Sequence, residues 1–152
     1  MYKICKLDIE TWEGVLYTEL TNLITRILGK METLTIINRA GRQRMITQKL
    51  MKLFFIQRYK VQYSGKVDRE IMDCIEQFNV TQIMLMNCAE HCKRVKDSIV
   101  KVQDAWMQFI LSFNTLEVDQ VVELNGIVLI EMDKLVNQLV EHFSPELQVA
   151  VK

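Results

Sequence analysis

The fold class is decided by residues 16–55, which read LYTELTNLITRILGKMETLTIINRAGRQRMITQKLMKLFF. Within this stretch one set of positions recurs at alternating spacings of four and three residues, which places them along one face of a helix. The set consists of Leu16, Leu20, Leu23, Ile27, Lys30, Leu34, Ile37, Gly41, Arg44, Gln48, Met51 and Phe55. No proline interrupts it, so we expect a helix from about residue 10 to residue 62, either continuous or broken near Gly29.

The same helical spacing of apolar residues continues through the rest of the chain. A second helix is expected to begin near Val67, after the stop signal Ser64-Gly65, and to break within residues 86–93. A third ends at Asn114-Thr115, and a fourth runs from about residue 117 to residue 143, where Ser144-Pro145 stops it. The expected core residues are Ile71, Ile75, Phe78, Ile83 and Leu85 in the second helix, Val95, Ile99, Val102, Trp106, Phe109, Ile110 and Phe113 in the third, and Val121, Leu124, Val128, Met132, Leu135 and Leu139 in the fourth.

These four segments predict an all-α fold, an antiparallel four-helix bundle with a long first helix extended at its N-terminal end. Residues 1–30 form the N-terminal helical extension, residues 31–143 the bundle and residues 144–152 a flexible tail. One proline and five glycines are too few for a fold with many tight turns, which disfavours a β-rich alternative.

Composition excludes several classes of function. Nineteen basic residues balance nineteen acidic ones, so no electrostatic surface for nucleic acid or for a membrane is indicated. No apolar run reaches the length of a membrane span, and the N-terminus lacks the features of a secretory signal. We therefore expect a cytoplasmic protein, unless the chain is an excised sensor domain, and four cysteines that are thiols.

One anomaly in the first stripe points to a ligand. Apolar positions give way there to Gly41, Arg44 and Gln48. A glycine inside a helix costs about 1 kcal/mol relative to alanine, and an arginine on a buried seam needs a partner for its charge. Gly41 lets a group approach the backbone, while the planar guanidinium of Arg44 suits an oxyanion. A solvated helix face fits the pattern equally well, because residues 38–50 are rich in polar side chains.

The segment INRAGRQRMITQKL, residues 37–50, closely resembles the signature of the PilJ-type sensor domain of type IV pilus methyl-accepting chemotaxis proteins. It is also similar to the P-box of nitrate- and nitrite-sensing histidine kinases. The shared pattern is Asn, any residue, Ala-Gly, two residues, Arg-Met, then Ser or Thr and Gln followed by a basic residue. Weaker resemblance continues to about residue 143 and includes Val102, Trp106 and Phe109, then Leu124-Asn125 and residues 132–136, MDKLV.

The resemblance implies a four-helix sensor bundle that dimerises through its first helices. In nitrate-sensing members one anion lies on the twofold axis between two P-box helices, held by the Arg of the Arg-Met pair from both subunits. In this sequence that residue is Arg44, with backbone approach at Gly41. Asn38, Arg42 and Gln48 match the motif and are further candidate ligand-binding residues.

The sequence also departs from the family. Arg39 stands where members usually have an apolar residue, and residues 1–30 are amphipathic where relatives have a membrane helix. No kinase or methyl-accepting segment follows the bundle. We therefore expect a stand-alone homodimeric sensor of nitrate or nitrite, which is no enzyme, uses no cofactor and signals to a partner protein such as a histidine kinase.

Two alternatives remain open at this stage. The chain fits a helical adaptor that binds a partner helix through its first stripe and no small ligand. It also fits a redox or metal sensor, because Cys88 and Cys92 are four residues apart, with His91 between them, and would share one face of a helix. Cys74 could join them from the neighbouring helix. That spacing is not a standard zinc motif, so we assign no metal ligands. No catalytic constellation of residues is recognisable in the sequence.

Overall fold

The structure, a computed structural model, describes residues 4–59, 65–115 and 117–143. These residues form four helices, α1 (Ile4–Tyr59), α2 (Gly65–Cys88), α3 (Lys93–Ser112) and α4 (Val118–Phe143), and they contain no strand. The predicted all-α helical bundle is confirmed. The expected stop signals at Ser64 and at Ser144-Pro145, and the expected tail, lie outside the described residues.

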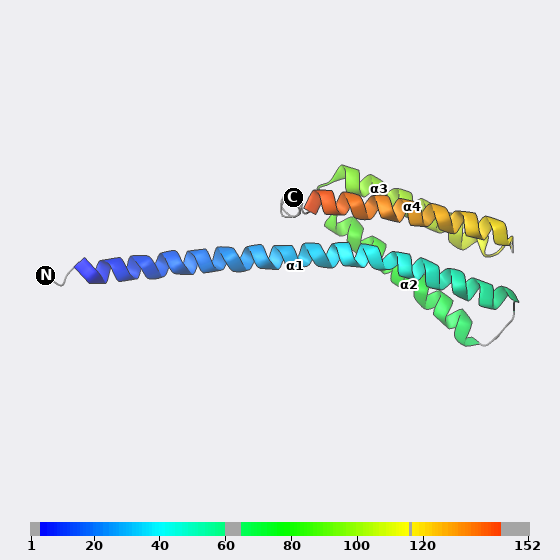
Figure 1. Ribbon diagram of the computed structural model, residues 1–152, viewed down its shortest axis with the longest axis horizontal. Helices are drawn as coiled ribbons and strands as arrows, with labels where there is room; N and C mark the ends of the chain where they lie inside the picture. Colours follow the sequence, from blue (N-terminus) through cyan, green and yellow to red (C-terminus); the bar gives the residue numbers. More distant parts are fainter. Residues whose placement is uncertain (1–3, 60–64, 116, 144–152) are drawn as a thin grey trace, which may run out of the picture. The chain divides into compact units, whose positions relative to one another are not determined.

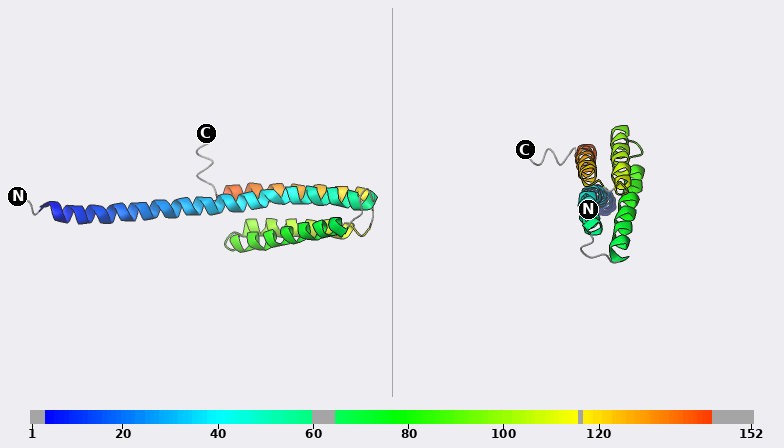
Figure 2. Two further views of the ribbon diagram at one scale, coloured as in Figure 1. Left: turned by 90° about the horizontal axis from the view of Figure 1, so that it is seen from below. Right: turned by 90° about the vertical axis from the view of Figure 1, so that its right-hand side faces the viewer.

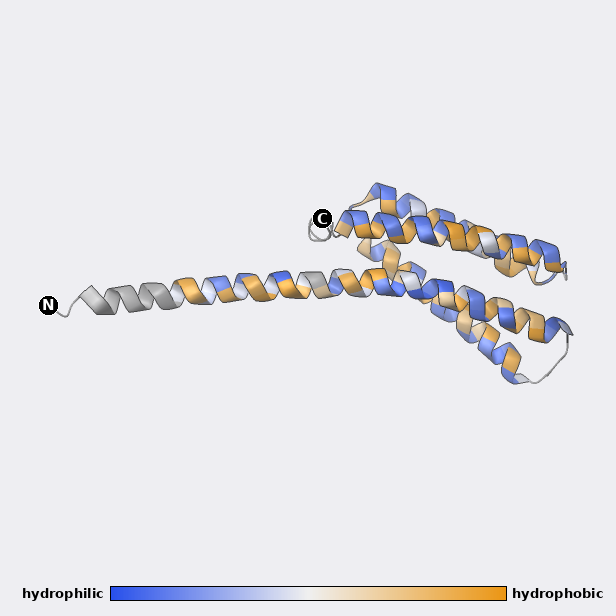
Figure 3. Cartoon of the chain, viewed as in Figure 1, coloured by the Kyte–Doolittle hydropathy of each residue, from blue (hydrophilic) through white to orange (hydrophobic). Residues whose placement is uncertain are grey.

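The chain divides into two compact units, residues Met1–Thr35 and Ile36–Lys152. In the first unit the described backbone from Ile4 onward is helical, and Gly29 does not interrupt it. Apolar side chains of this unit are largely exposed and recur along the ribbon in Figure 3. They are Val15, Leu16, Tyr17, Leu20, Leu23, Ile24, Ile27, Leu28, Met31 and Leu34.

In the second unit, residues 36–59 of α1 lie beside α2, and α3 lies beside α4 (Figure 1). The end-on view of Figure 2 places the four helices around a square, in chain order. Each helix therefore has two neighbours, and consecutive helices run in opposite directions. No described helix has a stretch of the length and apolarity that crossing a lipid bilayer requires.

The core of this bundle is built around a stacked aromatic pair. The rings of Phe78 on α2 and Trp106 on α3 lie almost parallel, with their centroids 3.7 Å apart. The indole Nε1 of Trp106 donates a hydrogen bond to Oδ1 of Asn79, so the polar end of this buried ring is satisfied. Phe109 and Phe113 extend the cluster towards Phe54 of α1. One aromatic layer thus links three of the four helices.

Most of the predicted core is buried, with one clear error. In α3 and α4 the apolar positions predicted from the spacing are buried or half-buried. In α2 the prediction fails at Ile83, whose side chain is 64 % exposed, because the polar Gln82 takes the inward position beside it. Spacing alone did not reveal that an amide occupies a core position.

The boundary between α2 and α3 falls within the predicted residues 86–93. Helix α2 ends at Cys88, and residues 89–91 form a turn closed by a 3.0 Å hydrogen bond from the Cys92 N–H to the Ala89 carbonyl. Cys92 has extended backbone angles and occupies the N-cap of α3 without a side-chain cap. The break contains neither glycine nor proline. The side chain of Ala89 is buried in the turn and so anchors it to the core.

We expect Phe78→Ala to lower the free energy of unfolding by about 3–5 kcal/mol, because it empties one side of the aromatic stack. Ile83→Ala, on the same helix, should change it by no more than about 0.5 kcal/mol, since that side chain is exposed. Chemical denaturation followed by circular dichroism measures both. Equal destabilisation by the two substitutions would contradict the structure, in which Phe78 is buried and Ile83 is exposed.

Candidate functional site

The motif segment, residues 37–50, lies entirely within α1 and presents two different faces. Ala40, Gln43, Thr47 and Leu50 are buried against the other helices of the bundle. Their spacings of three, four and three residues form a stripe that lies one residue before the stripe predicted from the sequence. Successive helical residues are about 100° apart, so this shift turns Gly41, Arg44 and Gln48 out of the bundle interior.

The buried face of the motif is held by amides. Nε2 of Gln43, which is fully buried, donates to the backbone carbonyl of Phe78 at 3.2 Å. Its Oε1 accepts a 2.9 Å hydrogen bond from Nε2 of Gln82 on α2. The hydroxyl of Thr47 donates to the Gln43 carbonyl at 2.6 Å. Gln43 therefore positions α1 against α2, while Thr47 also lies 3.6 Å from the sulfur of Met132 on α4; neither role was predicted from the sequence.

Within this amide network one acceptor is left over. Oε1 of Gln82 is buried and makes no hydrogen bond to any described residue. Reversing the Gln82 amide would bring two oxygens together at Gln43, whose own orientation is set by the Phe78 carbonyl. A buried unpaired acceptor costs about 1–3 kcal/mol. The network therefore orients α1 on α2 but lowers the free energy of unfolding by an amount of this order.

The outward face of the motif carries the predicted ligand-binding residues Gly41, Arg44 and Gln48. Gly41 is half-buried, and a Cβ placed on it would meet no atom within 4 Å. Packing within the chain therefore does not require a glycine at this position. Arg44 and Gln48, on the next two turns, are exposed, so the three residues share one open strip along α1.

Arg44 has an acidic partner inside the chain. Its Nη1 lies 2.5 Å from Oδ1 of Asp133 on α4, and the two side chains are 46 % and 48 % exposed. Within the bundle of one chain the stripe that carries Arg44 is turned outward, so its charge is not buried there. An ion pair this exposed contributes only about 0–1 kcal/mol, and only Nη1 of the guanidinium is engaged. The other N–H donors of Arg44 make no hydrogen bond to a described residue.

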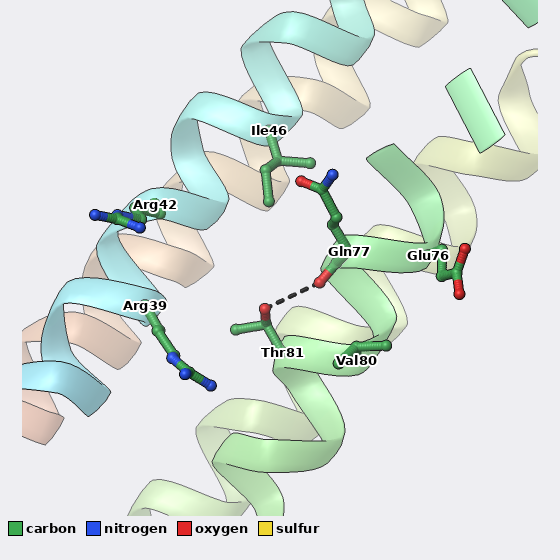
Figure 4. Close-up of a pocket in the computed structure, with 7 residues that line it drawn as sticks. All are labelled: Arg39, Arg42, Ile46, Glu76, Gln77, Val80 and Thr81. Carbon is green, nitrogen blue, oxygen red and sulfur yellow. Dashed lines mark hydrogen bonds between the residues drawn. The ribbon is translucent and has the colours of Figure 1, made fainter. Parts of the chain in front are cut away.

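The other arginines of the motif lie elsewhere on the helix. Arg42 is two residues from Arg44, so the two side chains project to nearly opposite sides of α1. Arg39 and Arg42 line a cleft between α1 and α2, which Figure 4 shows. Asn38 is exposed and makes no hydrogen bond to any described side chain. The structure thus groups Gly41, Arg44 and Gln48, and it separates Arg42 from them.

Asp133 is the second residue that the sequence analysis did not assign. It belongs to the MDKLV segment that carries part of the family resemblance, yet helical spacing could not show that it faces Arg44. The signal available was chemical: an acidic residue of α4 can pair with an arginine of α1. Pairing the two required the packing of the helices.

The described cysteines do not form a metal site. No group of three or more His, Cys, Asp or Glu side chains within the described ranges is placed to hold a metal ion. The expectation that Cys88 and Cys92 share a helix face is wrong, because α2 ends at Cys88 and Cys92 begins the next helix. Cys74 is buried, Cys88 is exposed and Cys92 is half-buried. His91 lies exposed in the intervening turn.

Comparisons with known proteins return no match, whether to family models, to curated proteins or to solved structures. The likeness to the PilJ-type signature therefore rests on the residues of the motif itself.

Burial raises the pKa of the Cys74 thiol, an effect that Glu70 and Asp73 reinforce and Lys49 opposes. The thiolate is the reactive species, so we expect Cys74 to react with iodoacetamide much more slowly than Cys88 near neutral pH. Its rate should rise as the pH is raised towards its elevated pKa. Peptide mapping by mass spectrometry measures both rates, and Cys88→Ser serves as the control. Equal rates at neutral pH would show that Cys74 is accessible.

Proposed function

We propose that this chain is a sensor or regulatory domain that binds a small planar oxyanion, nitrate or nitrite, at Arg44. The protein acts as a homodimer, joined through its first helix, with the anion between the Arg44 side chains of two copies. It carries out no chemistry on the anion and needs no cofactor. Its output passes to a signalling partner, such as a histidine kinase.

The observation that supports this proposal is the open strip at Gly41, Arg44 and Gln48. Intramolecular packing leaves space above Gly41, and only Nη1 of the Arg44 guanidinium bonds to a described residue. Planar, paired donors match the planar oxygens of nitrate and nitrite. The PilJ-type motif has its anion-binding arginine and its glycine at these same two positions.

A dimer through the first helix would complete this site. The exposed residues Leu16, Leu20, Leu23 and Ile27 follow the same repeat that continues in the sequence to Gly41 and Arg44. Exposed apolar residues in a heptad repeat are typical of helices that associate with a second helix. With two copies in parallel, each Arg44 would lie opposite its counterpart.

Asp133 gives this site a route for signalling. In the unliganded chain it neutralises Arg44 and so reduces the repulsion expected between two arginines at a dimer axis. An anion bound by Arg44 would compete with Asp133 and loosen the contact between α1 and α4. A ligand shifts a conformational equilibrium only if it binds one state more tightly than the other. Here the anion would bind more tightly to the state in which the ion pair between Arg44 and Asp133 is broken.

A helical adaptor is the second candidate function. The ten exposed apolar side chains between Val15 and Leu34 favour it, because they form an unpartnered surface in the first unit. An adaptor would bind a partner helix through this surface without any small ligand. Isothermal titration with nitrate, nitrite, chloride and sulfate distinguishes the two functions, since only the sensor binds nitrate or nitrite.

Replacing Arg44 by Ala should weaken nitrate binding by roughly 10- to 150-fold for each charge-assisted hydrogen bond lost, which corresponds to about 1.5–3 kcal/mol. Arg44→Lys should also weaken it, because an ammonium lacks the planar pair of donors. Isothermal titration calorimetry of the full chain measures the affinity.

The matched control is Asp133→Asn, which removes the same ion pair and retains the guanidinium. This variant should bind nitrate at least as tightly as the parent, since it loses the competing carboxylate. The site is wrong if Arg44→Ala binds nitrate like the parent, or if Asp133→Asn abolishes binding.

Gly41→Ala should raise the free energy of unfolding by up to about 1 kcal/mol, because the new methyl group meets nothing and alanine favours the helix. The same methyl group should lower nitrate affinity by blocking close approach to the backbone. Gly126→Ala in α4 is the matched control, since its Cβ also meets nothing and should stabilise the helix without affecting nitrate. Unchanged nitrate binding in Gly41→Ala would mean that the anion does not approach this glycine.

A further inference from the structure

A cleft of about 360 Å³ opens between α1 and α2 (Figure 4), and Arg44 does not belong to its lining. One wall is α1 and the other is the middle of α2. The lining residues are Arg39, Arg42, Ile46, Glu76, Gln77, Val80 and Thr81. None of the contacts that hold the Gln43 network involves these side chains.

The two arginines of the cleft carry charges that no described carboxylate neutralises. Arg39 reaches from α1 towards α2, and its one hydrogen bond to a described residue goes to the thioether sulfur of Met84, a weak acceptor. Arg42 makes no hydrogen bond or ion pair with any side chain within the described ranges. Glu76 belongs to the lining, but Figure 4 shows its carboxylate directed away from both arginines. Neither arginine of the lining is therefore paired with a described carboxylate.

The neutral and apolar residues of the cleft indicate what else a ligand would contain besides negative charge. The side chain of Gln77 extends into the opening, where its amide offers a neutral donor, and the Thr81 hydroxyl is already engaged with the Gln77 carbonyl. Ile46 of α1 supplies apolar surface that faces α2, and Val80 belongs to the lining on the same side of α2 as Glu76. The cleft is larger than a bare phosphate or sulfate ion.

We infer that this cleft is a second anion site, which binds the dianionic phosphoryl group of a small organic phosphate. Two guanidinium groups balance two negative charges, whereas a carboxylate or nitrate would leave one charge unbalanced. The organic part of the ligand would rest on Ile46. This site is separate from that of Arg44, so phosphate binding in the cleft can be tested independently of nitrate binding.

Binding requires one side-chain movement. Figure 4 shows Arg39 directed across the cleft and Arg42 at its rim, with the guanidinium directed away from α2. Arg42 is exposed, and turning it over the opening breaks no hydrogen bond to a described residue.

Titration of the full chain with phenyl phosphate, inorganic phosphate and benzoate, followed by calorimetry, tests the inference. Phenyl phosphate should bind more tightly than inorganic phosphate, which lacks the apolar part, and than benzoate, which has one charge. Chemical shifts of backbone amides should change within residues 39–46 and 76–81. Failure of the parent to bind phenyl phosphate at millimolar concentration would overturn the inference.

Arg39→Gln and Arg42→Gln should each weaken phenyl phosphate binding at least tenfold and leave nitrate binding unchanged. Arg69→Gln is the matched control, because Arg69 is an exposed arginine on α2 outside the cleft. It should bind phenyl phosphate like the parent. Arg44→Ala should also retain it, and circular dichroism confirms that each variant is folded. Parent-like affinity in both cleft variants, or loss of binding in Arg44→Ala, would assign the phosphate to another site.

Discussion

The buried amide of Gln43 determines how α1 is rotated in the bundle. Its side chain donates to the Phe78 carbonyl and accepts from Gln82, so both hydrogen-bonding ends are satisfied by α2 at one orientation of the helix. Turning α1 by one residue would bury Arg44 in place of Gln43. The positive charge of Arg44 would then lose its hydration, which is unfavourable. The amide network therefore decides which side chains of the motif remain available to a ligand.

This rotation divides the arginines of the motif between two environments. Arg44 lies on the α4 side, where Asp133 partly neutralises it beside the open space at Gly41. Arg39 and Arg42 lie on the α2 side, where no described carboxylate neutralises them. A single arginine next to an acidic competitor suits a weakly held monoanion, and a pair without a competitor suits a dianion. The two proposed sites differ in ligand because their local charge balance differs.

The same network also links the candidate sites to the core. The Phe78 carbonyl accepts from Gln43, and the Phe78 ring stacks on Trp106 of α3. A displacement of α1 that breaks the Gln43 contact would therefore reach the aromatic layer shared by three helices. The bond between Arg44 and Asp133 is exposed and weak, so it can open without disturbing this layer. The contact between α1 and α4 can therefore loosen while α1 and α2 remain packed against each other.

The sequence by itself determined the all-helical fold, the four helices and most of the core, because apolar spacing and the scarcity of proline and glycine are local properties of the chain. It also singled out Gly41 and Arg44, since a glycine and a charge stand out in an apolar stripe. Tertiary structure alone decided that the buried stripe of α1 runs through Ala40, Gln43 and Thr47, one residue earlier than the spacing indicated. It alone paired Arg44 with Asp133, turned Ile83 outward and placed Cys88 and Cys92 on different helices. The physical reason is that a helix of mixed composition can bury more than one face, and hydrogen bonds from neighbouring helices select the face that is buried.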